Sequence, residues 1–250
     1  MLEILKLFNF PTPNLSVGTD VKTKKLGSTG FNVPFEIKKE DNDLYVLYIK
    51  GQVWMKYDNN HLQAAQVFSH YYIAEGDVIT TGLGLAVREN WLLNNPKVKS
   101  LTVLEKSKDL IEYHKEVNPD LFKEANIINC DAKTYKGKCD TLLLDHYEWE
   151  PMNEIINDVN NICNNNIECK KMWFWHLETQ IIADLHGWYE NNIWNEFREG
   201  KFKINPETFK DIKNVYENIK INHKLEKLPN LTNQELQLIL TIYTEFYQIM

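Results

Sequence analysis

The sequence predicts an α/β fold: a doubly wound, mostly parallel sheet with a small N-terminal β domain and a helical C-terminal tail. Short apolar runs alternate with segments of helical periodicity from residue 76 to residue 197. One run, Leu142-Leu143-Leu144, is apolar on both faces, as a parallel strand between two helix layers must be. This alternation implies right-handed crossovers within one sheet.

The segment from Gly76 to Glu105 organises the rest of the chain. It reads as a strand at 78–81, the loop Gly82-Leu83-Gly84-Leu85-Ala86, a helix at 87–94 and a strand at 98–104. Glycines permit a sharp turn and close approach of a ligand, and an acid about 20 residues on can accept the hydroxyls of a ribose. The unit predicts a nucleoside-bearing ligand; the alternative is an ordinary strand-to-helix turn. Ala86 takes the third small position and no Lys-Ser or Lys-Thr follows, which disfavours a P-loop.

The remaining elements follow from periodicity and capping residues. Within the core, helices are expected at 108–117, 152–163 and 180–197, and strands at 125–129, 139–144 and 171–176. Upstream, strands are expected at 35–38, 44–49 and 52–57 and a helix at 61–70. Downstream, helices are expected from 205 to about 219 and from 232 to about 247.

These elements divide the 250 residues into three parts. Residues 1–74 form a small N-terminal β domain with a linking helix. Residues 75–200 form the ligand-binding α/β domain. Residues 201–250 form a helical C-terminal extension.

Composition excludes several classes of protein. No apolar run approaches the ~20 residues that a membrane span needs, and the charged N-terminus without a cleavage site indicates a mature cytoplasmic protein. A net charge of −7 argues against a nucleic-acid surface and fits a neutral or cationic small substrate. The four cysteines form no CxxC pair and have no His at zinc spacing, so we expect reduced thiols and no metal site.

Polar residues follow the ends of successive predicted strands. They are the Gly82 loop, Glu105, Asp131 and Asp145. Acids often end strands only because turns are polar. In open α/β sheets, however, ligands bind beyond the carboxyl ends of the strands, so four such sites in consecutive units predict one shared crevice.

This series resembles the class I S-adenosylmethionine-dependent methyltransferase fold, a Rossmann-like fold. The resemblance implies that the loop passes under the methionine part of the donor, that Glu105 holds the ribose and that Asp131 lies near the adenine. The residues implied in donor binding are Gly82, Leu83, Gly84, Glu105, Lys106, Asp131 and Ala132.

Within that superfamily the chain looks most like the spermidine synthase branch, on the phrase from Asn95 to Glu105 and the N-terminal β domain with Gly51-Gln52 at its last hairpin. The branch's Asp-x-x-Asp pair matches Asp145 and Glu148, where one carboxylate takes a proton and the other fixes an ammonium. His146 is a further candidate base. Substrate contacts are implied for Gln52, Gln63 and Tyr147.

Two departures from the branch favour methyl transfer over aminopropyl transfer. Leu85 stands where the branch has an acid in its loop, and Gln63-Ala64-Ala65 replaces its Tyr-His-Glu-like motif. A methyl donor needs only its sulfonium carbon and a nucleophile in line. The expected partner is a small-molecule acceptor such as an amine, and related synthases imply a homodimer.

Three alternatives to methyl transfer stay open. The first is a polyamine aminopropyltransferase that uses decarboxylated S-adenosylmethionine. The second is a catalytically silent nucleoside-binding or scaffold domain, suggested by Leu85, Ala86 and the unusual tail. A nicotinamide dehydrogenase ranks last, because such enzymes usually have a third glycine where Ala86 stands.

Overall fold

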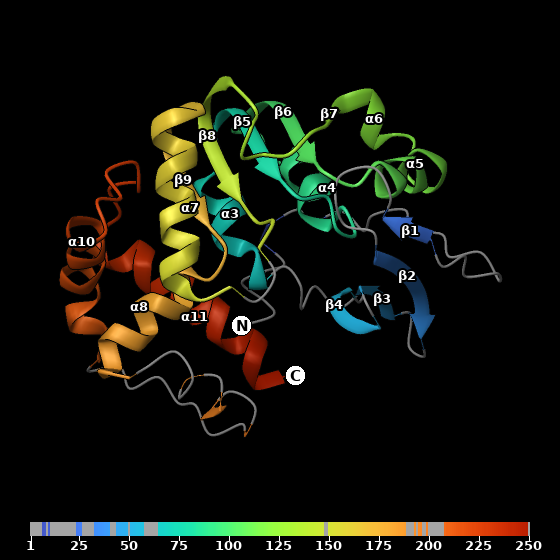
Figure 1. Cartoon of the computed structure of the whole chain (residues 1–250). Helices are drawn as coiled ribbons and strands as arrows, with labels where there is room; N and C mark the ends of the chain where they lie inside the picture. Colours follow the sequence, from blue (N-terminus) through green and yellow to red (C-terminus); the bar gives the residue numbers. More distant parts are fainter. Residues whose placement is uncertain are drawn as a thin grey trace.

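The computed structural model describes residues 7, 8, 10, 24–26, 33–40, 44–49, 51–57, 65–147, 150–188, 193, 195, 196, 199 and 208–249. These residues form an α/β core, an antiparallel sheet on its N-terminal side and a group of C-terminal helices (Figure 1). The predicted fold class is confirmed.

The core is a five-stranded parallel sheet in the order β7-β6-β5-β8-β9. Its strands are β5 (Gly76–Thr81), β6 (Val98–Glu105), β7 (Asn126–Asn129), β8 (Gly137–Leu144) and β9 (Ile167–Phe174). The first strand of this sheet, β5, lies in its middle. The next two, β6 and β7, extend the sheet on one side of β5, and β8 and β9 extend it on the other side. The order therefore reverses between β5 and β8, and this is where open α/β sheets form a ligand crevice.

Helices cover this sheet. They are α3 (Phe68–Ile73), α4 (Val87–Leu93), α5 (Lys108–Val117), α6 (Leu121–Glu124), α7 (Met152–Asn165) and α8 (Leu177–His186). Helix α4 packs on β6, α5 and α6 pack on β7, and α7 packs on β9 (Figure 1). As predicted, the Ser107 side chain caps α5, by accepting a hydrogen bond from the Leu110 N–H.

The centre of the core is fully buried. Leu142, Leu143 and Leu144 have no exposed surface, as predicted for a strand covered on both faces. Trp91 of α4 and Trp173 of β9 are also fully buried. Burying a side chain of leucine size contributes roughly 1.5–3 kcal/mol, so these residues hold β8 between its helix layers.

Two core elements differ from their predicted bounds. Strand β9 begins at Ile167 rather than 171, because Ile167 and Cys169 are buried between exposed Glu168 and Lys170, which is the alternation of an edge strand. Helix α8 covers Leu177–His186 rather than 180–197. It ends because Gly187 adopts a left-handed conformation, with φ of 63°, at the C-cap.

The N-terminal sheet is antiparallel, in the order β1-β2-β3-β4. Its strands are β1 (Lys24–Leu26), β2 (Val33–Glu40), β3 (Leu44–Ile49) and β4 (Gln52–Tyr57). It contacts the core through Phe35, whose ring centroid lies 6.4 Å from that of Tyr113, and through Met55 at the glycine loop. Part of the predicted helix at 61–70 lies outside the described residues, and α3 continues to Ile73.

The C-terminal region is helical, as predicted. It consists of η2 (Thr208–Asp211), α10 (Ile212–Asn222) and α11 (Asn233–Ile249). Helix α10 packs on α8, and α11 packs on both α3 and α8 (Figure 1). The Thr179 and Tyr243 hydroxyls, 2.8 Å apart, form a buried hydrogen bond between α8 and α11. The extension is thus part of the packed core.

Candidate functional site

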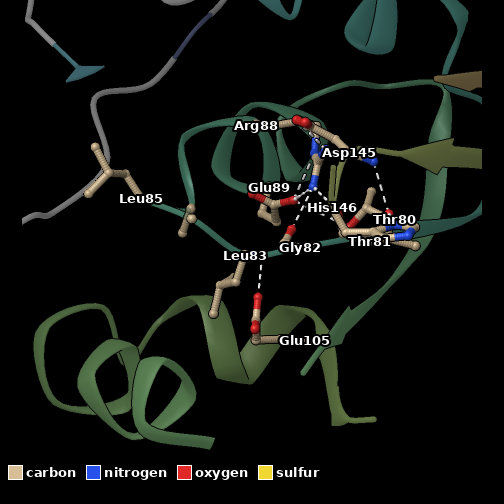
Figure 2. A network of polar contacts seen from close by, with 12 residues as sticks. Thr80, Thr81, Gly82, Leu83, Leu85, Arg88, Glu89, Glu105, Asp145 and His146 are labelled. Atoms are coloured by element: carbon tan, nitrogen blue, oxygen red, sulfur yellow. Dashed lines mark hydrogen bonds and ion pairs between the residues drawn. The ribbon is translucent and has the colours of Figure 1, made fainter. Parts of the chain in front are cut away.

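The glycine loop and the acid after β6 are directly bonded. Glu105 Oε2 accepts a hydrogen bond of 2.7 Å from the Leu83 N–H (Figure 2). Its Oε1 accepts one of 2.6 Å from the Ser107 N–H. Glu105 is buried, and burial raises its pKa even though these N–H donors favour the carboxylate. The carboxylate therefore fixes the loop at the end of β5 to the end of β6.

The loop needs glycine at Gly82 for two reasons. Its φ is 78°, in the left-handed region, and a Cβ there would lie 2.5 Å from the Asp145 carbonyl oxygen after β8. Gly84 also has a positive φ, of 50°, but a Cβ there would meet only the flexible Met55 side chain, at 3.0 Å. Glycine at position 82 therefore lets the chain after β5 pass close to the backbone after β8.

Most backbone N–H groups of the loop are used within the protein. Gly82 donates to the Leu104 carbonyl at 2.9 Å, Leu83 to Glu105, Leu85 to Met55 Sδ at 3.5 Å, and Ala86 to the Leu83 carbonyl at 2.7 Å. A phosphate-binding loop points such groups at its ligand. Most N–H groups of this loop are therefore not free to bind a phosphate.

The glycine loop is also held by a histidine and by its own buried leucine. His114 of α5 donates from Nε2 to the Gly84 carbonyl at 2.8 Å, and burial lowers its pKa to about 4, so the ring is neutral. Leu85 is fully buried and points away from the polar network of Figure 2.

A buried arginine joins the loop to the end of β8. Arg88, in the first turn of α4, donates to the Thr81 carbonyl at 3.1 Å and the Gly82 carbonyl at 2.7 Å. Its guanidinium also pairs with Glu89 at 2.5 Å and with Asp145 Oδ2 at 2.8 Å (Figure 2). Burial opposes the charge of Arg88, yet Glu89 and Asp145 raise its pKa, so the guanidinium stays charged.

Asp145, the predicted base, is therefore an anchored carboxylate. One oxygen pairs with Arg88, and the other, Oδ1, has no hydrogen bond or ion pair with any described residue. Burial raises the pKa of Asp145, while the Arg88 charge acts in the opposite direction. A carboxylate held at one oxygen and available at the other can accept a proton or hold a cation.

The acid after β7 lies at the adjacent strand end. Asp131 Oδ2 pairs with Lys106 Nζ at 2.9 Å, and its Oδ1 accepts from the Lys133 N–H at 2.9 Å. Partial burial acts against ionisation, but Lys106 and the Lys133 N–H hold the pKa of Asp131 below its usual value. Ala132 beside it is buried. Asp131 is thus charged and partly exposed beyond the carboxyl end of β7.

After β8, His146 is bonded through both ring nitrogens. Nδ1 lies 2.7 Å from Thr81 Oγ1, and Nε2 lies 3.2 Å from Asp158 Oδ2 on α7. Asp158 also pairs with Lys133 at 3.1 Å. The ring of Tyr147 lies against that of His146, with centroids 4.4 Å apart.

A surface pocket of about 360 Å³ lies on the α7 side of this loop. Tyr147 and Lys133 line it together with three acids, Glu150, Glu154 and Asp158. Its lining therefore carries more negative than positive charge.

The structure brings most of the predicted residues to one edge of the sheet and places one of them, Gln52, elsewhere. The residues at or just after the carboxyl ends of β5 to β8 are Gly82, Leu83, Gly84, Glu105, Lys106, Asp131, Ala132, Asp145, His146 and Tyr147. Gln52 is exposed at the start of β4, in the N-terminal sheet. Glu148 and Gln63 lie outside the described residues, so their roles stay predictions.

The sequence reasoning missed Arg88, Glu89, Thr81, Asp158 and Met55. One signal was available for the first two: they are a charged pair just after the loop, in a helix that also contains the apolar residues Trp91, Leu92 and Leu93. Charged residues are almost never fully buried unless they are paired. Thr81, Asp158 and Met55 carried no such signal.

The described residues contain neither a membrane-spanning helix nor a metal-binding cluster. None of their helices combines the length and apolar character of a membrane span. Within the same residues, no cluster of three or more His, Cys, Asp or Glu side chains is arranged to hold a metal ion.

Comparison with known proteins gives matches among solved structures only. No family model and no curated protein matches the chain. Spermidine synthase from Thermotoga maritima is 16% identical, with a TM-score of 0.40, over 54% of this chain and 51% of that one. A spermidine synthase in complex with the transition state analogue AdoDATO is 16% identical, with a TM-score of 0.41, over 56% of this chain and 52% of that one. YjhP from E. coli is 10% identical, with a TM-score of 0.35, over 74% of this chain and 85% of that one. The match thus spans about half the length of the spermidine synthases.

Proposed function

We propose that this protein is an S-adenosylmethionine-type transferase that acts on a small acceptor. The observation that carries the proposal is the bond between Glu105 and the Leu83 N–H, which joins the glycine loop to the acid after β6. Asp131 and Asp145 follow the adjacent strands. Such an edge suits an adenosine moiety, because an acid after the second strand can accept ribose hydroxyls.

The residues present fit such a donor. Glu105 keeps further lone pairs beside its two N–H contacts, so it can also accept from a ribose. Gly82 and Gly84 keep side chains off the loop, and the internal use of the loop N–H groups supports a ligand without phosphates. In our proposal the donor is held by Gly82, Leu83, Gly84, Glu105, Lys106, Asp131 and Ala132. When bound, it would supply an electrophilic carbon next to a sulfonium.

Asp145 is the proposed acceptor-side carboxylate. Arg88 fixes one of its oxygens, so the other can hold or deprotonate a nucleophile beside the loop. The acidic lining of the pocket beside Tyr147 favours a cationic or amine acceptor. Methyl transfer is proposed ahead of aminopropyl transfer because buried, apolar Leu85 replaces an acid that would hold the aminopropyl amine.

Calorimetric titration with S-adenosylmethionine and with methylthioadenosine tests donor binding. We expect both to bind the wild type, and Asp131→Asn to weaken binding about 10- to 100-fold, since a hydrogen bond to a charged group contributes about 1.5–3 kcal/mol. Asp120→Asn, at an exposed acid on the N-terminal side of α6, is the matched control and should bind like the wild type. No heat with either ligand in folded protein would exclude the proposal.

Turnover with the two donors separates the reactions. Methylated product from S-adenosylmethionine supports methyl transfer, whereas a polyamine product from decarboxylated S-adenosylmethionine and putrescine would establish aminopropyl transfer instead. Asp145→Asn should abolish turnover but leave donor binding within a fewfold of wild type, because Asp145 is assigned to the acceptor.

A second candidate is a catalytically silent nucleoside-binding or scaffold domain. It is favoured by the internal satisfaction of the site: Glu105 is bonded within the protein through both oxygens, and Met55 covers the loop. Donor binding without turnover of any amine would support this candidate.

A further inference from the structure

Four contacts connect the loop after β8 to α7 and β5. The Asp145 N–H donates to Thr81 Oγ1 at 2.9 Å, and Thr81 Oγ1 lies 2.7 Å from His146 Nδ1. His146 Nε2 lies 3.2 Å from Asp158 Oδ2, and Lys133 Nζ lies 3.1 Å from Asp158 Oδ1. These contacts form one chain, Asp145 to Thr81 to His146 to Asp158 to Lys133.

The chemistry of each group decides which one donates in these hydrogen bonds. Asp158 is a carboxylate whose pKa is held below its usual value by His146 and Lys133, although burial acts against it, so it only accepts. His146 must therefore donate from Nε2. With a single proton on the ring, at Nε2, Nδ1 accepts and the Thr81 hydroxyl donates to it. That hydroxyl still accepts from the Asp145 N–H.

We propose that His146 is a positioning residue rather than a proton acceptor, and that Asp158 sets its orientation. Both ring nitrogens have protein partners, so a substrate would have to displace Thr81 or Asp158 to reach either of them. The chain instead locks the backbone at Asp145 onto the last residue of β5. The predicted effect of His146 on turnover rests on the proposed function. The locking of the Asp145 backbone does not, because it can be measured without a bound donor.

The decisive measurement is hydrogen exchange of the Asp145 backbone amide, followed by NMR in the ligand-free protein. Thr81→Val removes the acceptor and should speed exchange about tenfold or more. Asp158→Ala, two bonds further along, should also speed it severalfold. Thr81→Ser keeps the hydroxyl and should restore wild-type exchange.

Thr80→Val is the matched control. Thr80 is next to Thr81 on β5 and equally buried, but its hydroxyl donates to Glu89, which is not part of the series of contacts from Asp145 to Lys133. It should leave Asp145 exchange unchanged. Equal exchange of Asp145 in wild type and in folded Asp158→Ala would overturn the proposal.

His146→Gln tests the role of the ring. Glutamine offers one acceptor and one donor, so it can bridge Thr81 and Asp158. We expect it to keep Asp145 exchange within about twofold of wild type and turnover above a tenth. A loss of turnover of 100-fold or more, with exchange unchanged, would show a general base and overturn the proposal. If the wild type binds no donor, the proposed function fails, while the exchange measurements still decide the inference.

Discussion

Arg88 shows how one side chain can organise a site from inside the protein. It is buried, carries a charge, and contacts the end of β5, the glycine loop and the carboxylate after β8. A buried charge persists only when it is paired and hydrogen-bonded. Arg88 meets that condition with Glu89, Asp145 and two carbonyls, so it connects three strand-end features at one point.

Removing this arginine should strongly destabilise the fold. Arg88→Met leaves Glu89 buried without a cation, and breaking a buried pair in this way costs about 3–5 kcal/mol. Urea unfolding at pH 7 measures the difference. Lys170→Met breaks the exposed pair with Asp140 and should change stability little. Comparable losses in the two variants would contradict the assignment of Arg88 as the internal connector.

Glu178 gives a prediction in pH. It is buried at the start of α8, where it accepts from Trp173 Nε1 at 3.0 Å, and burial raises its pKa from 4.5 to about 7. Between these values the folded state binds the proton and the unfolded state does not, so stability falls as pH rises. The full effect is roughly 3 kcal/mol.

Glu178→Gln should remove this dependence. Relative to the variant, the wild type should lose stability between pH 4.5 and 7 and show a constant difference above about pH 8. Urea unfolding at several pH values measures it, and Glu168→Gln at an exposed position of β9 serves as control. A wild-type-to-variant difference that does not change with pH would disprove the buried, protonated state.

At the scale of elements, the strand-to-helix loop after β5 is defined by its contacts as much as by its glycines. Gly82 faces a backbone carbonyl across the sheet, whereas Gly84 faces a flexible thioether. The two glycines have the same sign of φ but different surroundings. They therefore make a matched pair for testing how closely β5 and β8 must approach.

Gly82→Ala should be more damaging than Gly84→Ala. Both lose about 1–2 kcal/mol to the left-handed conformation, but only Gly82→Ala pushes a Cβ against the Asp145 carbonyl. Thermal unfolding should show a larger fall in Tm for Gly82→Ala, and calorimetry a loss of donor binding. Gly84→Ala should bind within about tenfold of wild type. The reverse order would contradict the loop geometry.

At the scale of the whole molecule, the N-terminal sheet contributes directly to the site. Met55 of β4 accepts the Leu85 N–H and covers Gly84. The division of the chain at residues 74 and 200 stays a proposal, and the contacts of β4 with the glycine loop and of α11 with α3 and α8 mean that the proposed parts share one packed interior.

Met55→Ala should therefore loosen the glycine loop without unfolding the sheet. We expect faster hydrogen exchange of the Leu85 amide and weaker donor binding, because the amide loses the Met55 sulfur that accepts its hydrogen bond. Val53→Ala, at an exposed position of the same strand, should change neither. Unchanged Leu85 exchange in Met55→Ala would show that the N-terminal sheet does not support the loop.

Much of this architecture was predictable because it depends on local pattern. The apolar run Leu142–Leu144, the Ser107 cap and the alternation of strands and helices each reflect neighbours in sequence, and the structure confirms them. The bounds of β9 and α8 were missed because burial of alternate residues and the conformation of Gly187 decide them.

The sequence by itself determined that an α/β sheet would form and that a glycine loop and several acids would follow its strands. Only the tertiary structure decided the partners: Arg88 with Asp145, Leu83 with Glu105, His146 with Thr81 and Asp158. The physical reason is that β5 lies between β6 and β8, so residues far apart in sequence become neighbours through strand order, which local periodicity does not encode.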